Sequence, residues 1–114
     1  MTHPDPSGAR AVFDRQLDCL GRRDLDGLLE NYHPNAVLLR FDGVFSGPDR
    51  IRDAFASYFT LEPRLLELRS LVEFDGTILY RAAMEIGGRR KETVGVMMLR
   101  NGMIWRQTAG VLDG

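Results

Sequence analysis

Three glycine-containing dipeptides divide the second half of the chain into segments of strand length. They are Asp75-Gly76, Gly87-Gly88 and Asn101-Gly102. Residues of this kind tolerate the positive φ angles that tight hairpin turns require. We therefore expect strands over about residues 65–74, 77–86, 90–99 and 103–111, joined in order as an antiparallel meander.

Two amphipathic helices are predicted ahead of this meander. The first begins near Ala9, with Ser7 as its cap, and ends at Gly21. The second is capped by Asp24 and ended by His33-Pro34, because the residue before a proline avoids the helical region. Both segments have side chains at helical spacing; these are Val12, Phe13, Gln16, Leu17 and Leu20 in the first and Leu25, Leu28, Leu29 and Tyr32 in the second.

A strand and a third helix complete the first half of the chain. Residues 36–41 have the pattern of a strand, and Asp42-Gly43 that of a turn. The helix is predicted to start at Ser46-Gly47-Pro48-Asp49, with a serine cap and a proline in its first turn, and to end at Glu62-Pro63. This order predicts an α+β fold, in which three N-terminal helices pack on a curved, mainly antiparallel sheet that encloses a pocket.

Composition limits the possible functions. The 114 residues suit one domain over 9–114 after a flexible N-terminus over 1–8. The net charge of −1 does not suggest nucleic-acid binding. We expect a cytoplasmic protein, since no segment is apolar enough to span a membrane and no signal peptide is evident. A single cysteine, Cys19, and two histidines, His3 and His33, cannot complete a zinc site, so no metal or cofactor is expected.

Side-chain alternation assigns one face of each strand to the interior. Hairpin loops of odd length would pair Tyr80 with Val96 and Met84 with Glu92. A two-residue turn at Asn101-Gly102 would then align the last strand. The predicted inner face, strand by strand, carries Leu66, Leu68, Ser70, Val72 and Phe74; Ile78, Tyr80, Ala82, Met84 and Ile86; and Val94, Val96, Met98, Trp105, Gln107 and Ala109.

The chain resembles the SnoaL-like branch of the nuclear transport factor 2-like superfamily, which includes polyketide cyclases and ketosteroid isomerases. The resemblance covers about residues 9–112 and rests on four segments: residues 21–27, residues 32–37, the helix start at residues 47–52 and the closing residues 104–106. It implies a conical, barrel-like fold in which the curved sheet and the helices surround a deep apolar pocket. It also implies a dimer, because many members are dimeric.

The same resemblance speaks against isomerase chemistry. Ketosteroid isomerases use an aspartate base, together with a tyrosine and a protonated aspartic acid as an oxyanion hole. At these positions the resemblance places Arg40 for the base, Gln16 for the tyrosine and Val96 for the acid. All three roles are lost, so we expect no turnover of an unsaturated ketosteroid. Polyketide cyclases need a carboxylate in the pocket, and Glu92 is the candidate for it.

Two polar residues have alternative interpretations. Alternation puts Val37, Leu39 and Phe41 on the buried face of their strand and leaves Arg40 in solvent. The resemblance instead puts Arg40 in the pocket, where its guanidinium would bind a carboxylate or phenolate. Gln107 faces inward, where its amide either bonds a neighbouring group or orients a ligand carbonyl.

The primary hypothesis is a small-molecule-binding domain with a mostly apolar pocket. Its ligand would be a small apolar or aromatic molecule with a carboxylate or carbonyl group. The alternatives are an enzyme of the cyclase, isomerase or hydratase type and a protein-interaction module that dimerises through the outer sheet face. We expect that face to carry Thr93, Gly95, Met97, Leu99, Ile104, Arg106 and Thr108. The predicted pocket residues are Phe13, Gln16, Tyr32, Arg40, Phe55, Tyr80, Met84, Glu92, Val96, Met98, Trp105 and Gln107.

Overall fold

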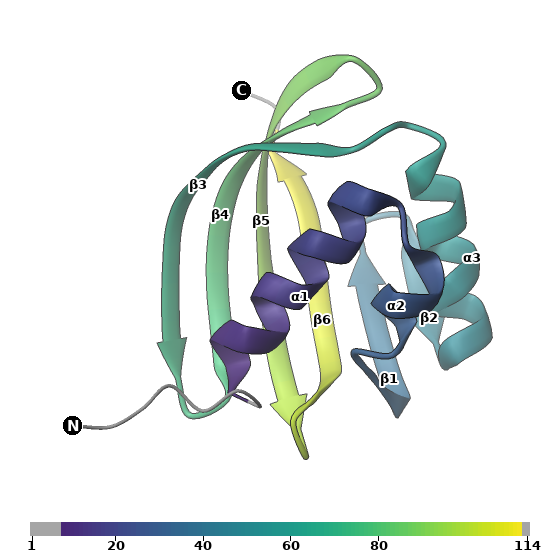
Figure 1. The fold of residues 1–114 in the computed structure, drawn as a ribbon, viewed down its shortest axis with the longest axis vertical. Coiled ribbons are helices and arrows are strands. Elements are labelled where there is room, and N and C mark those ends of the chain that lie inside the picture. The colour runs from purple at the N-terminus through teal and green to yellow at the C-terminus, as the bar shows by residue number, and fades with distance from the viewer. Residues whose placement is uncertain (1–7, 113–114) are drawn as a thin grey trace.

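Six strands form one curved sheet in the order β2-β1-β6-β5-β4-β3 (Figure 1). The computed structural model describes residues 8–112. The strands are β1 (Tyr32–Arg40), β2 (Gly43–Ser46), β3 (Arg64–Phe74), β4 (Thr77–Ile86), β5 (Arg89–Arg100) and β6 (Met103–Leu112). β1 runs parallel to β6, and all other neighbours are antiparallel. The predicted α+β fold with a mainly antiparallel sheet is confirmed.

The helices α1 (Ala9–Arg22), α2 (Leu25–Leu29) and α3 (Pro48–Phe59) lie together on one side of the sheet, with α1 in front of the curved strands (Figure 1). They bury Val12, Leu28 and Ile51 completely against the inner sheet face. Within residues 8–112, no helix is long and apolar enough to cross a membrane. The predicted N-terminal segment and its cap Ser7 lie outside the described residues, except for Gly8.

The helix ends differ from prediction in four places, one of them the end of α3, which lies at Phe59 and not at Glu62-Pro63. α1 continues through Gly21 and ends where Arg23 takes a left-handed conformation. α2 ends at Leu29, and Tyr32 starts β1 because it pairs there with β6. Ser46 belongs to β2 and caps nothing, since Gly47 occupies the N-cap of α3. The predicted cap of α2 is confirmed, because the Gly27 amide donates to Asp24 Oδ1 over 3.0 Å.

The four meander strands form where the turns predict them, but the inner face of β3 was predicted wrongly. Phe74 pairs with Thr77, so the first turn has two residues, not three. Two register shifts then bring Leu65, Leu68 and Leu71 onto the inner face opposite Met84, Ala82 and Tyr80. At such bulges, successive inward-facing residues are three positions apart in the sequence instead of two. Of the predicted inner residues Leu66, Leu68, Ser70, Val72 and Phe74, all but Leu68 are exposed.

The predicted orientation of β5 is inverted. Ile86 pairs with Arg89, so the Gly87-Gly88 loop also has two residues, and Tyr80 pairs with Gly95 instead of Val96. A shift of one residue moves every side chain to the opposite face. The inner face of β5 therefore carries residues expected outside, namely Thr93, Gly95, Met97 and Leu99, and the outer face carries Val94, Val96 and Met98.

The orientation of β6 was predicted correctly only in part. The two-residue turn at Asn101-Gly102 is confirmed, since Arg100 pairs with Met103. A register shift follows, at which Trp105 has no partner, and it restores Gln107 and Ala109 to the inner face. Ile104, expected outside, is fully buried, whereas Arg106 and Thr108 face outward as expected.

The orientation of β1 follows from its pairing with β6. Leu38 pairs with Gln107 and Arg40 with Ala109, so both face inward. The alternation argument, which buried Val37, Leu39 and Phe41, was wrong: Phe41 is 90% exposed and Leu38 is 1% exposed. The short strand β2, which continues the sheet beyond β1, was not predicted.

Candidate functional site

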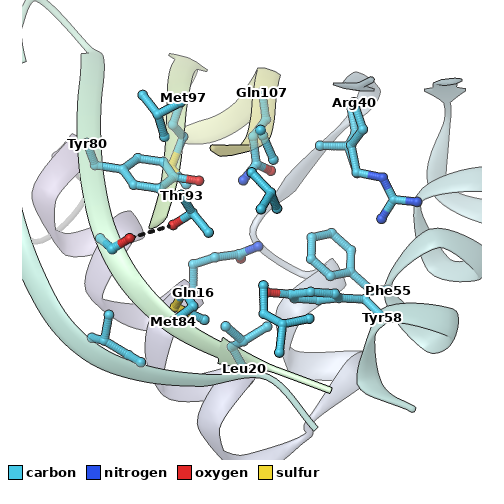
Figure 2. A pocket seen from close by; sticks show the side chains of 18 of the residues that line it. Gln16, Leu20, Arg40, Phe55, Tyr58, Tyr80, Met84, Thr93, Met97 and Gln107 are labelled. Carbon is cyan, nitrogen blue, oxygen red and sulfur yellow. Dashed lines mark hydrogen bonds between the residues drawn. The ribbon is translucent and has the colours of Figure 1, made fainter. Parts of the chain in front are cut away.

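A cavity of about 470 Å³ opens between the helices and the inner face of the sheet (Figure 2). Its walls are mostly apolar, and they include seven of the predicted pocket residues: Phe13, Gln16, Arg40, Phe55, Tyr80, Met84 and Gln107. α1 supplies the first two, α3 supplies Phe55, and the other four project from β1, β4 and β6. These seven residues, which were predicted from the sequence as pocket residues, therefore line one cavity.

Four predicted pocket residues lie on the outer face instead. Val96 and Met98 point away from the cavity because β5 is displaced by one residue in its pairing with β4. Trp105 occupies the bulge of β6, where the guanidinium carbons of Arg100 and Arg106 lie 4.1 and 3.8 Å from its ring centroid. None of the three lines the cavity.

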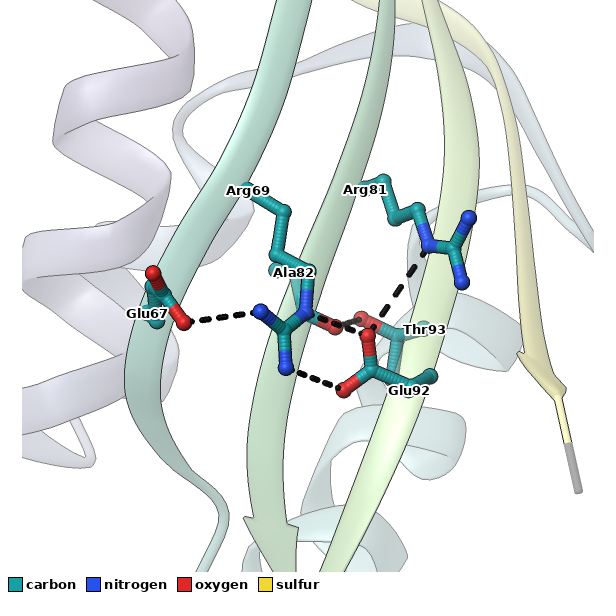
Figure 3. Close-up of polar contacts among 6 residues, drawn as sticks. All are labelled: Glu67, Arg69, Arg81, Ala82, Glu92 and Thr93. Carbon is teal, nitrogen blue, oxygen red and sulfur yellow. Dashed lines mark hydrogen bonds and ion pairs between the residues drawn. The ribbon is translucent and has the colours of Figure 1, made fainter. Parts of the chain in front are cut away.

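Glu92 is the fourth, and its surroundings exclude a role in the cavity. Arg69 binds its carboxylate through two nitrogens, one of them Nη2 at 3.2 Å, and Arg81 approaches from β4 at 3.8 Å (Figure 3). The hydrogen bond from Arg69 lowers the pKa of Glu92. An exposed, ion-paired carboxylate of this kind is a surface feature, so Glu92 is not the acid or base that cyclase chemistry would need.

Several cavity residues were missed by sequence reasoning. Met97 and Thr93 face inward from β5, and Tyr58 from α3. Recognising Gly87-Gly88 as a two-residue turn would have identified the two β5 residues, because the hairpin register decides which face they occupy. Leu65 follows from the bulges of β3, for which the sequence gives no clear signal.

The cavity floor is made of small residues between two polar ones. A single row of paired residues crosses four strands: Tyr80, Gly95, Ala109 and Arg40. Gly95 and Ala109 occupy the middle of the row, where large side chains would fill the space. Ala82 is also small and lines the cavity, whereas Ser70, expected beside it, is exposed on β3.

A chain of buried hydrogen bonds links α1 to β1 and β6 beside the cavity. Asn31 Nδ2 donates to Gln16 Oε1 over 3.1 Å, and Gln16 Nε2 donates to the Tyr32 hydroxyl over 2.8 Å. The Tyr32 hydroxyl in turn donates to Gln107 Oε1. Tyr32, which was predicted to line the pocket, is therefore buried behind the wall and holds Gln107 in place.

Arg40 is one of the residues that line the cavity, and the resemblance had placed it in the pocket. Its Nε and Nη2 atoms each donate to Asp42 over 3.0 Å, and its guanidinium carbon lies 4.6 Å from the Phe45 ring centroid. The hydrogen bond from Arg40 lowers the pKa of Asp42. Two of the five guanidinium donors are thus occupied, and the remaining three are available to an anionic group.

All three tyrosines of the chain lie around the cavity and ionise with difficulty. Burial raises the pKa of Tyr32 well above its usual value, raises that of Tyr80, and raises that of Tyr58 from 10.0 to about 12. The hydrogen bond from Gln16 opposes the rise in the pKa of Tyr32, and the nearby Gln107 amide opposes that of Tyr80. All three hydroxyls are therefore protonated and able to donate hydrogen bonds at neutral pH.

We expect the protein to lose stability in alkaline solution. Unfolded tyrosines ionise near pH 10, whereas the folded ones keep their protons to higher pH. The tyrosines' contribution to the free energy of unfolding is complete below pH 10. It is lost as the pH rises from 10 towards 12, by roughly 2–3 kcal/mol for Tyr58 alone. Urea unfolding at a series of pH values should show this loss, with a smaller slope in Tyr58→Phe. An identical slope in that variant would contradict the prediction.

The groups in the cavity suit binding better than proton transfer. Of the described residues that line it, Asp42 supplies the one carboxylate, and Arg40 already binds it. Gln16 and Arg40 line the cavity as the resemblance implied, but the residues of β5 that face inward there are Gly95 and Met97, neither of which is acidic. Within residues 8–112, no three His, Cys, Asp or Glu side chains gather in a way that could hold a metal ion.

Comparison with known proteins identifies one matching family model and solved structures with a similar fold. The family model described as "SnoaL-like domain" matches residues 13–107. None of the curated proteins compared matches the chain.

Solved structures share the fold at low sequence identity. An NTF2-like protein of unknown function from Cytophaga hutchinsonii has a TM-score of 0.81 at 11% identity, with coverage of 96% of this chain and 95% of that chain. A protein from Sinorhizobium meliloti, provisionally assigned as a polyketide cyclase, has a TM-score of 0.78 at 18% identity, with coverage of 87% and 93%. TerC, co-crystallized with polyporic acid, has a TM-score of 0.78 at 18% identity, with coverage of 89% and 88%.

Proposed function

The chain belongs to the SnoaL-like domain family, and from this premise we propose that it binds a small, largely apolar or aromatic molecule in the cavity between its helices and sheet. The observation that carries the proposal is the cavity itself: about 470 Å³ with apolar walls and a few convergent polar groups. Sites for small molecules in proteins have this size and composition.

The polar groups favour a ligand that bears a carboxylate or a carbonyl group. Arg40 keeps three donors that Asp42 does not use, and they would bind a carboxylate or phenolate. Gln107 offers its amide from the neighbouring strand β6, where it pairs with Leu38 of β1. TerC, a protein of similar fold, was co-crystallized with polyporic acid, which is a small organic molecule.

A catalytic role of the cyclase, isomerase or hydratase type is the alternative. The provisional assignment of the Sinorhizobium meliloti protein as a polyketide cyclase supports it. The cavity argues against it, because its carboxylate, Asp42, is paired with Arg40 and has a lowered pKa. A general base works best with a pKa near the working pH. We therefore propose binding in preference to catalysis.

Filling the cavity tests the binding proposal. We expect Ala109→Leu to weaken binding of 1-naphthoate at least tenfold, because the larger side chain occupies the floor between Tyr80 and Arg40. Stability should change little, since the cavity accepts the added volume. Isothermal titration and thermal unfolding measure the two effects, and Ala82→Leu should behave alike. Ala56→Leu, on the exposed side of α3, is the matched control.

Two outcomes would contradict the binding proposal. The first is failure of 1-naphthoate to bind the wild-type protein at millimolar concentration. The second is a loss of about 1–3 kcal/mol in the stability of both filled variants, which is the usual effect of overpacking a closed core.

The outer face of the sheet supports a second role, and we propose that it joins two copies of the chain. One paired row crosses all six strands and carries Val72, Leu79, Val96, Thr108, Leu39 and Val44. The next row adds Phe74, Met98 and Val37. Several of these are strongly exposed, including Phe74 at 81% and Val44 at 65%. Apolar patches of this extent commonly mark interaction sites.

A second copy of the chain fits this face in size and symmetry. Five strands of 9 to 12 residues and the four-residue β2, about 4.8 Å apart, present roughly 900 Å². A stable interface needs about 800 Å² from each partner. A two-fold axis through the middle of the apolar row would place this row against the same row of the partner. The ion pairs of Arg69 and Arg81 with Glu92 lie at the other end of the face, where they would form a polar rim.

A further inference from the structure

We infer that the Tyr80 hydroxyl and the Gln107 amide together bind one oxygen atom of the ligand, so that the cavity selects a carbonyl compound over the corresponding hydrocarbon. This inference rests on the proposed binding function and specifies which chemical group the inner wall recognises. It concerns a neutral acceptor at the sheet, and it is independent of the charge at Arg40.

The buried hydrogen-bond chain fixes the orientation of the Gln107 amide. Asn31 donates to the oxygen of Gln16, so the nitrogen of Gln16 donates to the Tyr32 oxygen. The Tyr32 proton is then directed to Gln107 Oε1. With its oxygen occupied in this way, the Gln107 amide presents its NH₂ group to the cavity. Each hydrogen bond in the chain fixes the orientation of the next amide or hydroxyl group, because these groups have distinct donor and acceptor atoms.

Tyr80 supplies the second donor. Figure 2 shows its hydroxyl and the Gln107 amide turned toward one another at the cavity wall. A protonated tyrosine hydroxyl can donate its hydrogen, and the nitrogen of the Gln107 amide carries two hydrogens. Two donors on neighbouring parts of the wall can therefore meet on one acceptor, such as a carbonyl oxygen with its two lone pairs.

Space for this oxygen exists because the floor beside Tyr80 carries no bulky side chain. Tyr80 lies over Gly95, and Ala109 follows in the same row of the sheet. Gln107 is 6% exposed, so a ligand that covered both donors without accepting from them would leave buried polar groups unpaired. Because of this penalty, the pair formed by Tyr80 and Gln107 would disfavour ligands that lack a carbonyl oxygen. Gln16 cannot serve in its place, since both ends of its amide are engaged in the chain.

The test compares 1-tetralone with tetralin, two neutral molecules of nearly equal shape that differ by the carbonyl oxygen. We expect the wild-type protein to prefer 1-tetralone by roughly three- to tenfold, the range that one or two hydrogen bonds to buried donors supply. Tyr80→Phe should reduce the preference to below twofold and keep the affinity for tetralin. Isothermal titration or ligand-observed NMR gives both dissociation constants for each variant.

Tyr32→Phe tests the positioning chain without removing any group that lines the cavity. It releases Gln107 Oε1, so the amide can turn and present either end. We expect the preference for 1-tetralone to fall as in Tyr80→Phe, with tetralin binding retained. If Tyr32 were merely structural, its loss would weaken both probes by the same factor, which contradicts the positioning role.

The outcomes separate this inference from the proposed function. Equal affinity of the wild type for the two probes, or a preference that persists in Tyr80→Phe, overturns the donor pair and leaves small-molecule binding intact. Binding of 1-naphthoate without either neutral probe also overturns it, because Arg40 would then govern recognition. If none of the three compounds binds, both the inference and the proposed function fail.

Discussion

Gly95→Ala should destabilise the domain by about 2–4 kcal/mol and abolish binding in the cavity, the effect expected when a side chain is forced into a packed site. A Cβ atom on Gly95 would lie 2.6 Å from the main-chain oxygen of Thr108, and still closer to the Tyr80 hydroxyl oxygen. The tyrosine can swing away, but the Thr108 oxygen is held by the sheet. The sheet must therefore distort, and Tyr80 must leave its position over the floor.

Urea unfolding gives the loss of stability, and Gly21→Ala is the matched control. The position of a Cβ on Gly21 meets nothing within 4 Å, and the residue lies within α1. Alanine is the better helix former, so this control should gain roughly 0.5–1 kcal/mol. The double variant Gly95→Ala/Tyr80→Leu should recover only part of the loss, since the contact with Thr108 persists. If Gly95→Ala stays within 0.5 kcal/mol of the wild type, the floor is not closed as described.

The local signals in the sequence predicted the elements well. Asp75-Gly76, Gly87-Gly88 and Asn101-Gly102 marked hairpins that all form. Asp24 was identified as a helix cap, and its carboxylate does accept from the Gly27 amide. Such signals act through a few neighbouring residues, so they can be read without knowledge of the remaining fold.

The inner and outer faces were predicted less well, because they depend on single-residue shifts. One residue of loop length at Gly87-Gly88 decides whether Val96 or Met97 lines the cavity. Phe13, Gln16 and Phe55 were predicted correctly to line it, since helical spacing leaves no such ambiguity. Arg40 was correctly placed by family resemblance and incorrectly by alternation, because its orientation is set by pairing with Ala109, distant in sequence.

The bulges account for the remaining errors. β3 has two register shifts, and β6 has one at Trp105. Each changes the facing of all residues beyond it, and none follows a glycine or proline that would mark it. The donor pair of the cavity illustrates the consequence: Gln107 faces inward only because the shift at Trp105 compensates for the different orientation of β5. The predicted registers of β5 and β6 were each wrong by one residue. These two errors cancel at Gln107, which faces inward as predicted, but the error in β5 remains at Val96 and Met98.

In the observed register, Val96 lies at the centre of the apolar outer row and not in the cavity, where it was predicted. We expect the largest effect on assembly from a substitution at this position. We expect the wild-type protein to be a dimer at tens of micromolar and Val96→Arg to be a monomer, with the dissociation constant raised at least hundredfold. Near a two-fold axis the substitution would bring two arginines together on a desolvated apolar surface. Burying such charges without partners costs several kcal/mol, and each 1.4 kcal/mol is a factor of ten in affinity.

Sedimentation velocity over a range of concentrations measures the dimer, and Ala56→Arg adds the same charge on exposed α3, away from the sheet face. That control should remain dimeric. Val96→Arg should also bind 1-naphthoate as the wild type does, because Val96 lies across the sheet from the cavity. This second measurement distinguishes loss of assembly from loss of the fold. A monomeric wild type, or a dimer unaffected by arginine at position 96, would show that the apolar row does not join two copies.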